Sequence, residues 1–344
     1  MRARAWMKQK GSCVLTVSLL LSLLSWPAQS ASANDTAFSG QATVVRATVA
    51  APPPLGPQTI ILSDTGALDS TGGAKEASLL EASVPDLLTV EVLHASTVGQ
   101  GQRSSSEASV ATVVLTVGGN TIAAEVLAAR ATAECHNGTA SVSGSSDIVG
   151  LMVNGQSIAV SGSPNQTIAL PVLGSFIIIN EQRSDRVGDL TVNALHVVVD
   201  GVADVIISSA HADITCGGPV CPGGDFVTGG GWITGTPSRE RGTFGVAGGI
   251  KNGAFWGHLT YIDHGTNMKV KGTGVTAYTV TGPTTRHIEG TAEIDGRSGF
   301  YQVDVSDNGE PGRNNDTFSL RLSDGYSAAG KLEGGNIQLH KPCK

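Results

Sequence analysis

Short runs in which apolar and polar residues alternate recur along most of the chain, with glycine, asparagine or proline between them. A period of two predicts β-strands, because successive side chains of a strand point to opposite faces of its sheet. In the first part of the chain the expected strands are 42–49, 59–62, 88–96, 109–117, 121–133, 148–153, 157–160, 176–180, 190–199 and 203–211. In the second part they are 226–233, 242–246, 254–262, 268–272, 274–280, 286–295, 299–305, 317–322 and 336–340. Strands and helices do not alternate regularly, so we expect an all-β protein rather than a doubly wound fold.

Two turn sequences add to this picture. Asn154-Gly155 separates two short apolar runs, and Gly118-Gly119-Asn120 separates two longer ones. Both predict tight β-hairpins, because glycine and asparagine readily adopt the positive φ angles of two-residue hairpin turns. Residues 74–84 differ, because their composition favours a helix that ends before Pro85.

Composition divides the chain into an export signal and two β domains. Residues 1–33 carry four basic residues, then the apolar stretch 14–26, then small residues. This order predicts a secretory signal peptide, cleaved after Ala33 or Ser30, whose apolar stretch is too short to span a bilayer comfortably. The parts that follow are an N-terminal β domain at 34–216, a Gly/Pro/Cys hinge at 217–224 and a Gly- and aromatic-rich C-terminal β domain at 225–344. We expect both domains to be antiparallel, sandwich-like or barrel-like.

Charge and hydropathy narrow the class of partner. The chain has 22 Lys and Arg against 29 Asp and Glu, a formal net charge of −7. Four of the basic residues and none of the acidic ones lie within 1–33, so the remainder carries −11. An acidic balance argues against nucleic acid and against anionic membrane surfaces as partners. No run of 18 apolar residues follows the signal and no sorting motif is present, so we expect no transmembrane segment and no covalent anchor.

Four cysteines follow the predicted signal peptide: Cys135, Cys216, Cys221 and Cys343. An even number in an exported protein favours disulfides, and three pairings are open. We favour Cys135–Cys216 and Cys221–Cys343, because the first two end small-residue strands that can lie side by side. Zinc is the rival interpretation for Cys216 and Cys221, but no second Cys/His pair accompanies them.

Aromatic residues are unevenly distributed. Residues 34–221 contain only Phe38 and Phe176, whereas residues 222–344 hold two Trp, four Tyr and five Phe. Trp232 and Trp256 are large and have glycine neighbours, so they are candidates for a flat platform on which a sugar stacks. The alternative is that both fill the core of a sandwich.

An oxygen-rich loop suggests calcium. Its candidate ligands are Asp304, Asp307, Asn308, Glu310 and Asp316. Their spacing is not that of an EF-hand, and an ordinary solvated hairpin is the alternative. We expect no other cofactor.

Histidines and catalytic motifs give little support for an enzyme. His258, Asp263 and His264 suggest a metal cluster by composition. On one strand, however, His258 and His264 lie roughly 20 Å apart and cannot share an ion. The chain also lacks a G-x-S-x-G elbow, an H-E-x-x-H helix and a catalytic-cysteine signature. We therefore expect a protein that is not an enzyme.

Several segments resemble a known family. Residues 176–182 (FIIINEQ) and 190–197 (LTVNALHV) resemble the bacterial choice-of-anchor P family. Four later segments resemble the domain that follows it in that family: 227–233, 257–264, 307–312 and 334–340. Together they cover nearly all of the chain after the signal. The resemblance implies bacterial export and a surface or extracellular location, and it implies no catalytic residues. The chain departs from the family in showing no C-terminal anchor.

Together these observations predict a non-catalytic secreted or cell-surface protein with a structural, adhesive or matrix-associated role. Its expected partners are cell-envelope or extracellular glycans, or surface proteins. Two alternatives remain: an extracellular carbohydrate-binding module, with or without calcium, and a secreted hydrolase.

Overall fold

The computed structural model describes residues 35–51, 54–218, 224–251 and 253–341. Within these residues the chain forms 23 β-strands and no helix, and neighbouring strands pair antiparallel. The predicted all-β fold class is therefore confirmed. The same residues contain no helix with the length and apolar character needed to cross a membrane.

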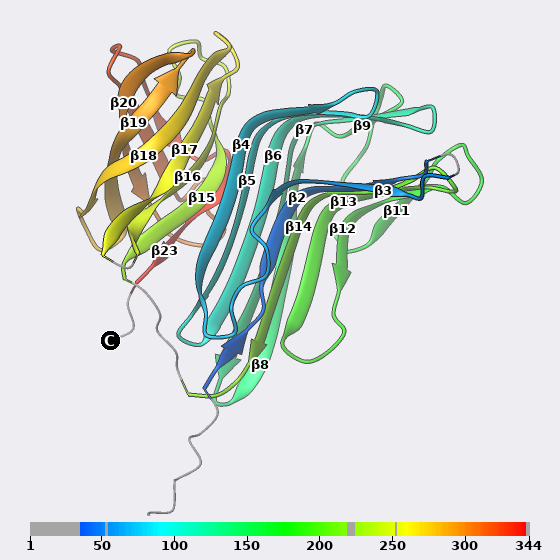
Figure 1. Ribbon diagram of the computed structural model, residues 1–344, viewed down its shortest axis with the longest axis horizontal. Helices are drawn as coiled ribbons and strands as arrows, with labels where there is room; N and C mark the ends of the chain where they lie inside the picture. Colours follow the sequence, from blue (N-terminus) through cyan, green and yellow to red (C-terminus); the bar gives the residue numbers. More distant parts are fainter. Residues whose placement is uncertain (1–34, 52–53, 219–223, 252, 342–344) are drawn as a thin grey trace, which may run out of the picture. The chain divides into compact units, whose positions relative to one another are not determined.

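The strands form three sheets (Figure 1). The first sheet has the order β11 (Gln166–Ala169), β12 (Phe176–Arg183), β13 (Asp189–Val199), β14 (Ala203–Thr215), β2 (Gln41–Val49) and β3 (Gln58–Asp64), with β1 (Ala37–Phe38) paired to β14. The second has the order β10 (Gln156–Ser157), β9 (Met152–Val153), β7 (Asn120–His136), β6 (Arg103–Val117), β5 (Leu88–Gln100) and β4 (Gly73–Val84), with β8 (Thr139–Val149) paired to β7. The third has the order β22 (Ser327–Lys331), β21 (Thr317–Leu322), β20 (Arg297–Ser306), β19 (Thr285–Ile294), β18 (Met268–Val280), β17 (Ala254–Asp263), β16 (Gly242–Lys251), β15 (Phe226–Ile233) and β23 (Gly334–His340).

The first two sheets pack face to face as a sandwich, with β14 lying against β6 and β7. Their shared core is aliphatic, and Leu127, Ile177 and Val205 are fully buried in it. A disulfide joins Cys135, at the end of β7, to Cys216, just after β14, with the two Cα atoms 5.7 Å apart. The first predicted pairing is thus confirmed. The two cysteines belong to opposing sheets, so they face each other across the sandwich instead of lying on neighbouring strands.

The third sheet uses large rings in its core. Phe244 and Phe318 stack with ring centroids 3.9 Å apart, and Tyr261 lies fully buried beside them. The sheet curls on itself, because Ala329 of β22 donates its backbone N–H to the Gly235 carbonyl beyond β15, at 2.9 Å. It is therefore a partly closed barrel.

The third sheet also packs on the second, and the described residues of both belong to one compact unit. Strands β15, β16 and β17 contact β4 and β5 (Figure 1). Glycine allows this close approach, because a Cβ on Gly230 would lie 2.8 Å from the Ser109 hydroxyl. An apolar cluster also lies in this contact. It consists of Val92 and Ala111 of the second sheet and Ile262 of the third.

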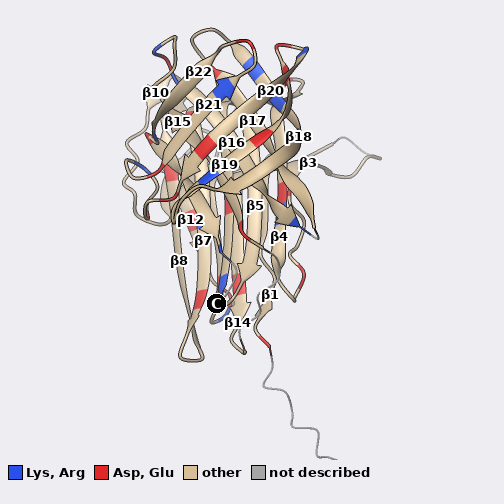
Figure 2. Ribbon diagram, turned by 90° about the vertical axis from the view of Figure 1, so that its left-hand side faces the viewer, with Lys and Arg blue, Asp and Glu red and all other residues tan. Residues whose placement is uncertain are grey.

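Charged residues are interspersed along the strands (Figure 2). Among the ion pairs that connect the third sheet with the second are Arg241–Glu125 and Lys269–Glu81. Such partly exposed pairs contribute about 1 kcal/mol or less each. The apolar contacts and the close backbone approach therefore dominate this interface.

Both predicted hairpin turns are confirmed. Asn154 and Gly155 link β9 to β10 with φ angles of 51° and 78°. Gly118 and Gly119 link β6 to β7 with φ angles of 55° and 76°. Positive φ at both central residues is the requirement of a type I′ turn, which matches the twist of the flanking strands.

The predicted helix at 74–84 is wrong, because this segment is strand β4, paired to β5 along nearly its whole length. Ordinary residues differ in helix propensity by less than about 1 kcal/mol each, so pairing with β5 along nearly the whole segment outweighs the local preference. The two strands predicted at 268–272 and 274–280 are one strand, β18, whose register is irregular between Gly272 and Gly274.

Some predictions fall outside the described residues. They are the signal peptide at 1–33, the central part of the hinge at 217–224 and the pairing of Cys221 with Cys343. These stay predictions.

Candidate functional site

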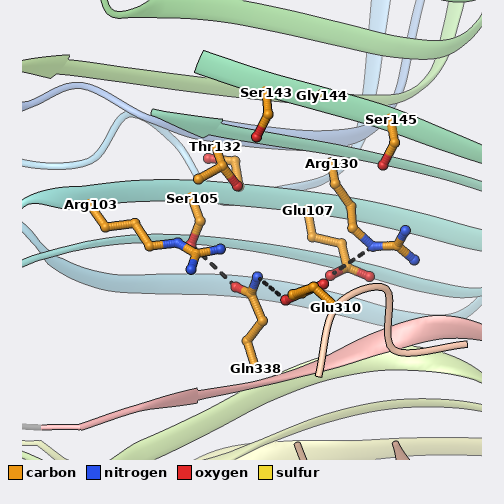
Figure 3. Close-up of a pocket in the computed structure, with 11 residues that line it drawn as sticks. Arg103, Ser105, Glu107, Arg130, Thr132, Ser143, Gly144, Ser145, Glu310 and Gln338 are labelled. Carbon is orange, nitrogen blue, oxygen red and sulfur yellow. Dashed lines mark hydrogen bonds and ion pairs between the residues drawn. The ribbon is translucent and has the colours of Figure 1, made fainter. Parts of the chain in front are cut away.

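A polar pocket of about 240 Å³ lies over strands β6, β7 and β8 (Figure 3). Residues that are distant in sequence, Glu310 and Gln338, close its opposite side. Side chains two apart on a strand share a face, so Arg103, Ser105 and Glu107 of β6 all point to this side of the sheet.

Strand register builds the floor of the pocket in two rows. The rows are Ser105–Thr132–Ser143 and Glu107–Arg130–Ser145, each running across β6, β7 and β8. Directly opposed side chains on one face lie close enough to interact. The floor is therefore a regular array of hydroxyl groups with one carboxyl and one guanidinium group.

The charged pair in this floor is buried. Glu107 is 7% exposed, and its Oε2 lies 3.6 Å from Arg130 Nε. Arg130 Nη2 also donates to Asp147 Oδ2 at 3.0 Å. Burial raises the pKa of Glu107 to about 7, a rise that the charge of Arg130 opposes and that of Glu310 reinforces. Burial lowers the pKa of Arg130, but Glu107 and Asp147 outweigh this effect and raise it.

Hydrogen bonds hold the opposite wall in place. Gln338 Nε2 donates to Glu310 Oε1 at 3.2 Å, and Ser105 Oγ donates to Gln338 Oε1 at 3.3 Å. Asn336 Nδ2 donates to the same Glu310 oxygen at 3.1 Å. Figure 3 shows Glu107, Glu310 and Arg130 among the residues that line the pocket.

This arrangement has two chemical capabilities. Hydroxyl, amide and guanidinium groups at fixed positions can exchange hydrogen bonds with a ligand that carries several hydroxyl groups. The Oε1 atom of Glu107 is buried and has no hydrogen-bond partner within the described chain. A carboxyl group with a pKa of about 7 can also donate or accept a proton near neutral pH.

The calcium candidates are only partly brought together. Asp307, Asn308, Glu310 and Asp316 lie in one loop, whereas Asp304 lies on β20 and contacts His287 at 2.7 Å. The carboxyl groups of Asp307 and Asp316 accept hydrogen bonds from backbone N–H groups of the chain. Asp316 accepts from the backbone N–H groups of Asn308 and Ile337, and Asp307 accepts from that of Leu339.

Burial also raises the pKa of Asp316 to about 6, helped by Asp307 and Glu310. Among the described residues, one group of His, Cys, Asp or Glu side chains has the spacing needed to hold a metal ion. That group does not include any residue of this loop. Calcium binding by this loop stays a prediction.

Trp232 and Trp256 do not form a shared platform. Trp232 is 7% exposed, and Trp256 is half-buried beside Phe226, with ring centroids 5.7 Å apart. On the intervening strand β16 they oppose Thr243 and Gly249, which are six positions apart. That spacing corresponds to roughly 20 Å.

His258, Asp263 and His264 are also kept apart. Asp263 accepts from Ser238 and Tyr326, and His264 Nε2 lies 2.8 Å from the Thr243 hydroxyl. His258 instead meets Glu76 of β4. His258 and His264 therefore have different partners, as their spacing along one strand predicts.

The pocket residues Glu107 and Arg130 were missed as site residues by the sequence analysis. The strand predicted at 109–117 began too late, so the alternation of Arg103, Ser105 and Glu107 was overlooked. A strand drawn from residue 103 would have shown three polar side chains on one face. Nothing local in the sequence indicates that Gln338 lies opposite them, because that contact depends on the packing of two sheets.

Comparison with known proteins does not assign this chain to a family. No family model and no curated protein matches the sequence. Among solved structures, kievitone hydratase from Nectria haematococca is similar at 8% sequence identity and a TM-score of 0.21, with 88% of each chain covered. A score this low carries no argument about fold or function. The resemblance to the choice-of-anchor P family stays a prediction.

Proposed function

We propose that this protein is an exported, non-catalytic extracellular protein that binds a polyhydroxylated ligand, such as the end of a glycan, in the pocket around Glu107 and Arg130. The observation that carries the proposal is the two-row floor of hydroxyl, carboxyl and guanidinium groups. These groups suit a saccharide, because each sugar hydroxyl both donates and accepts hydrogen bonds.

The size of the pocket supports a small ligand. Its volume of about 240 Å³ lies just below the roughly 300–1,000 Å³ of ordinary ligand pockets. A single sugar unit at the end of a chain fits this description better than a long polymer. Binding of chain ends suits an adhesive or matrix-associated role.

The disulfide supports the extracellular setting. Cys135–Cys216 links two sheets of the sandwich, and disulfides persist mainly in oxidising compartments. The predicted signal peptide and the acidic balance agree with this setting.

A secreted hydrolase is the second candidate, favoured by one observation. Glu107, whose pKa burial raises to about 7, lines the same pocket as a second carboxyl group, Glu310. Hydrolysis of glycosides generally uses two carboxyl groups that flank the scissile bond, one of them with a raised pKa.

A glycan array tests the proposal with matched variants of the full exported chain. We expect the wild type to bind a subset of glycans and Arg103→Gln, on the pocket rim, to lose this binding. Arg321→Gln is the control, because Arg321 is likewise an exposed arginine with a long carboxylate contact, 3.9 Å from Asp304. Equal binding by wild type and Arg103→Gln, or no binding by the wild type, would contradict the proposal. Cleavage of the bound glycans would favour the hydrolase.

A further inference from the structure

Three side chains suited to metal binding converge from three strands, away from the pocket of Figure 3. They are Glu76 of β4, His94 of β5 and His258 of β17. Each offers one ligand atom, and these atoms lie within 4.8 Å of one another. Register explains the arrangement, because His94 lies opposite Ser78 and Glu76 shares its face two residues earlier. The packing of the third sheet on the second then supplies His258.

The chain's own hydrogen bonds leave this cluster unsatisfied. Glu76 Oε2, His94 Nε2 and His258 Nδ1 are all buried, and none has a hydrogen-bond partner. Glu76 Oε2 and His258 Nδ1 lie 2.7 Å apart and face each other as an ion pair. His94 is completely buried, so water does not reach its ring. Buried polar atoms without partners are destabilising and rare, so the partnerless His94 Nε2 beside this ion pair points to a missing ligand.

The two rings are held in fixed positions. Ser78 Oγ lies 3.1 Å from His94 Nδ1 and 2.5 Å from His258 Nε2. A hydrogen bond to the second nitrogen is how proteins usually orient metal-binding histidines. Glycines make the space for the His94 side chain, because a Cβ on Gly245 would lie 3.0 Å from its Cβ.

The cluster is accessible from one side. A pocket of about 360 Å³ is lined by Glu76, Ser78 and His258, together with Thr260 and Lys271. An ion held by the three side chains would therefore have a coordination position facing this pocket, where water or a small ligand can bind.

We propose that Glu76, His94 and His258 bind a divalent transition-metal ion, with zinc preferred. Two imidazoles and one carboxylate form a ligand set that zinc takes at sites with an open fourth position. Calcium and magnesium prefer oxygen ligands throughout, so they are poor occupants of this site. Because the ligands come from the second and third sheets, the ion also ties these sheets together.

Titration of chelator-treated, full-length exported protein tests this site. Calorimetry with zinc chloride is expected to give one bound ion per chain, and cobalt chloride is expected to give the absorption bands of a four-coordinate nitrogen and oxygen site. Zinc affinity is expected to fall by more than 100-fold in Glu76→Gln and His258→Ala. The positioning variant Ser78→Ala should weaken zinc about 10–100-fold. Zinc should also raise the melting temperature of the wild type but not that of Glu76→Gln.

The control variant is His211→Ala, which removes a histidine that pairs with Asp189 at 2.9 Å outside the cluster. It is expected to bind zinc like the wild type. Glutamine has the size of glutamate and the Glu76 side chain is partly exposed, so we expect Glu76→Gln to fold. Its zinc affinity therefore tests the proposal even if His258→Ala fails to fold. Failure of the folded wild type to bind zinc or cobalt, or unchanged affinity in Glu76→Gln, would overturn the proposal.

Discussion

Burial changes the acid–base behaviour of Glu107. Its pKa is raised from 4.5 to about 7, mainly by burial, with Arg130 opposing the rise. A carboxyl group with a higher pKa in the folded state keeps a proton that the unfolded chain has already released, so ionisation opposes folding. This cost begins above pH 4.5 and is complete above about pH 7.

Replacing Glu107 by Gln should therefore flatten the dependence of stability on pH. Between pH 5 and pH 7 we expect the wild type to lose about 2 kcal/mol more unfolding free energy than Glu107→Gln. Urea denaturation of both proteins at the two pH values measures the difference. The substitution also removes the contact with Arg130. That loss lowers the stability of Glu107→Gln equally at both pH values, so it does not affect the change between them. Equal slopes would show that Glu107 titrates normally.

A second buried carboxyl group, Glu181, behaves in the opposite way. Its Oε2 accepts from Asn193 at 2.6 Å and lies 3.0 Å from His196 Nδ1. Burial raises the pKa of Glu181, but His196 and Asn193 outweigh it and lower the pKa to about 2. Burial lowers the pKa of His196, but Glu181 outweighs it and raises the pKa.

The Glu181–His196 pair should therefore stabilise the fold most between about pH 4.5 and pH 6.5. Below this window Glu181 loses its contribution as the pH falls towards its folded pKa. Above it, His196 loses its contribution as the pH rises through its own. We expect His196→Asn to cost roughly 3 kcal/mol at pH 5.5 and clearly less at pH 9. Denaturation at the two pH values measures this, and an equal loss at both would contradict it.

At the scale of strands and turns, the sequence indicated most elements but not their partners. Period-two alternation located strands such as β21 with their observed bounds. It failed for β4, whose helix-favouring composition is overruled by pairing with β5. The Glu76–His94–His258 cluster depends on the same pairing, so no local pattern could have revealed it. Elements governed by local alternation or turn chemistry were predictable, whereas sites built between sheets were not.

Turn chemistry makes a direct prediction at Gly119. Its φ of 76° is one that side-chain-bearing residues avoid, although a Cβ there would meet no atom within 4 Å. Gly119→Ala should therefore cost about 1–2 kcal/mol through backbone strain alone. Gly56→Ala is the matched control, because Gly56 has equal space and no positive φ. It should be neutral or slightly stabilising. Thermal denaturation compares them, and equal effects would rule out strain as the cause.

At the scale of the whole molecule, the described chain depends on three sheets that must stay in contact. Apolar burial joins the first two sheets, and glycine-lined approach joins the second to the third. The disulfide Cys135–Cys216 adds a covalent link between the first two across a sequence separation of 81. A link of this span restricts the unfolded chain strongly, since loop-closure entropy grows with the length of the loop.

Removing that link should lower stability without changing the fold. In the chain-entropy model, Cys135→Ala/Cys216→Ala loses about 4–5 kcal/mol of unfolding free energy. Urea denaturation of the double variant without reductant measures this link alone. Reductant breaks every disulfide, so any further loss when it is added to the double variant reports on the predicted Cys221–Cys343 bridge. A double variant as stable as the wild type would mean that sheet packing alone sets the stability of the sandwich.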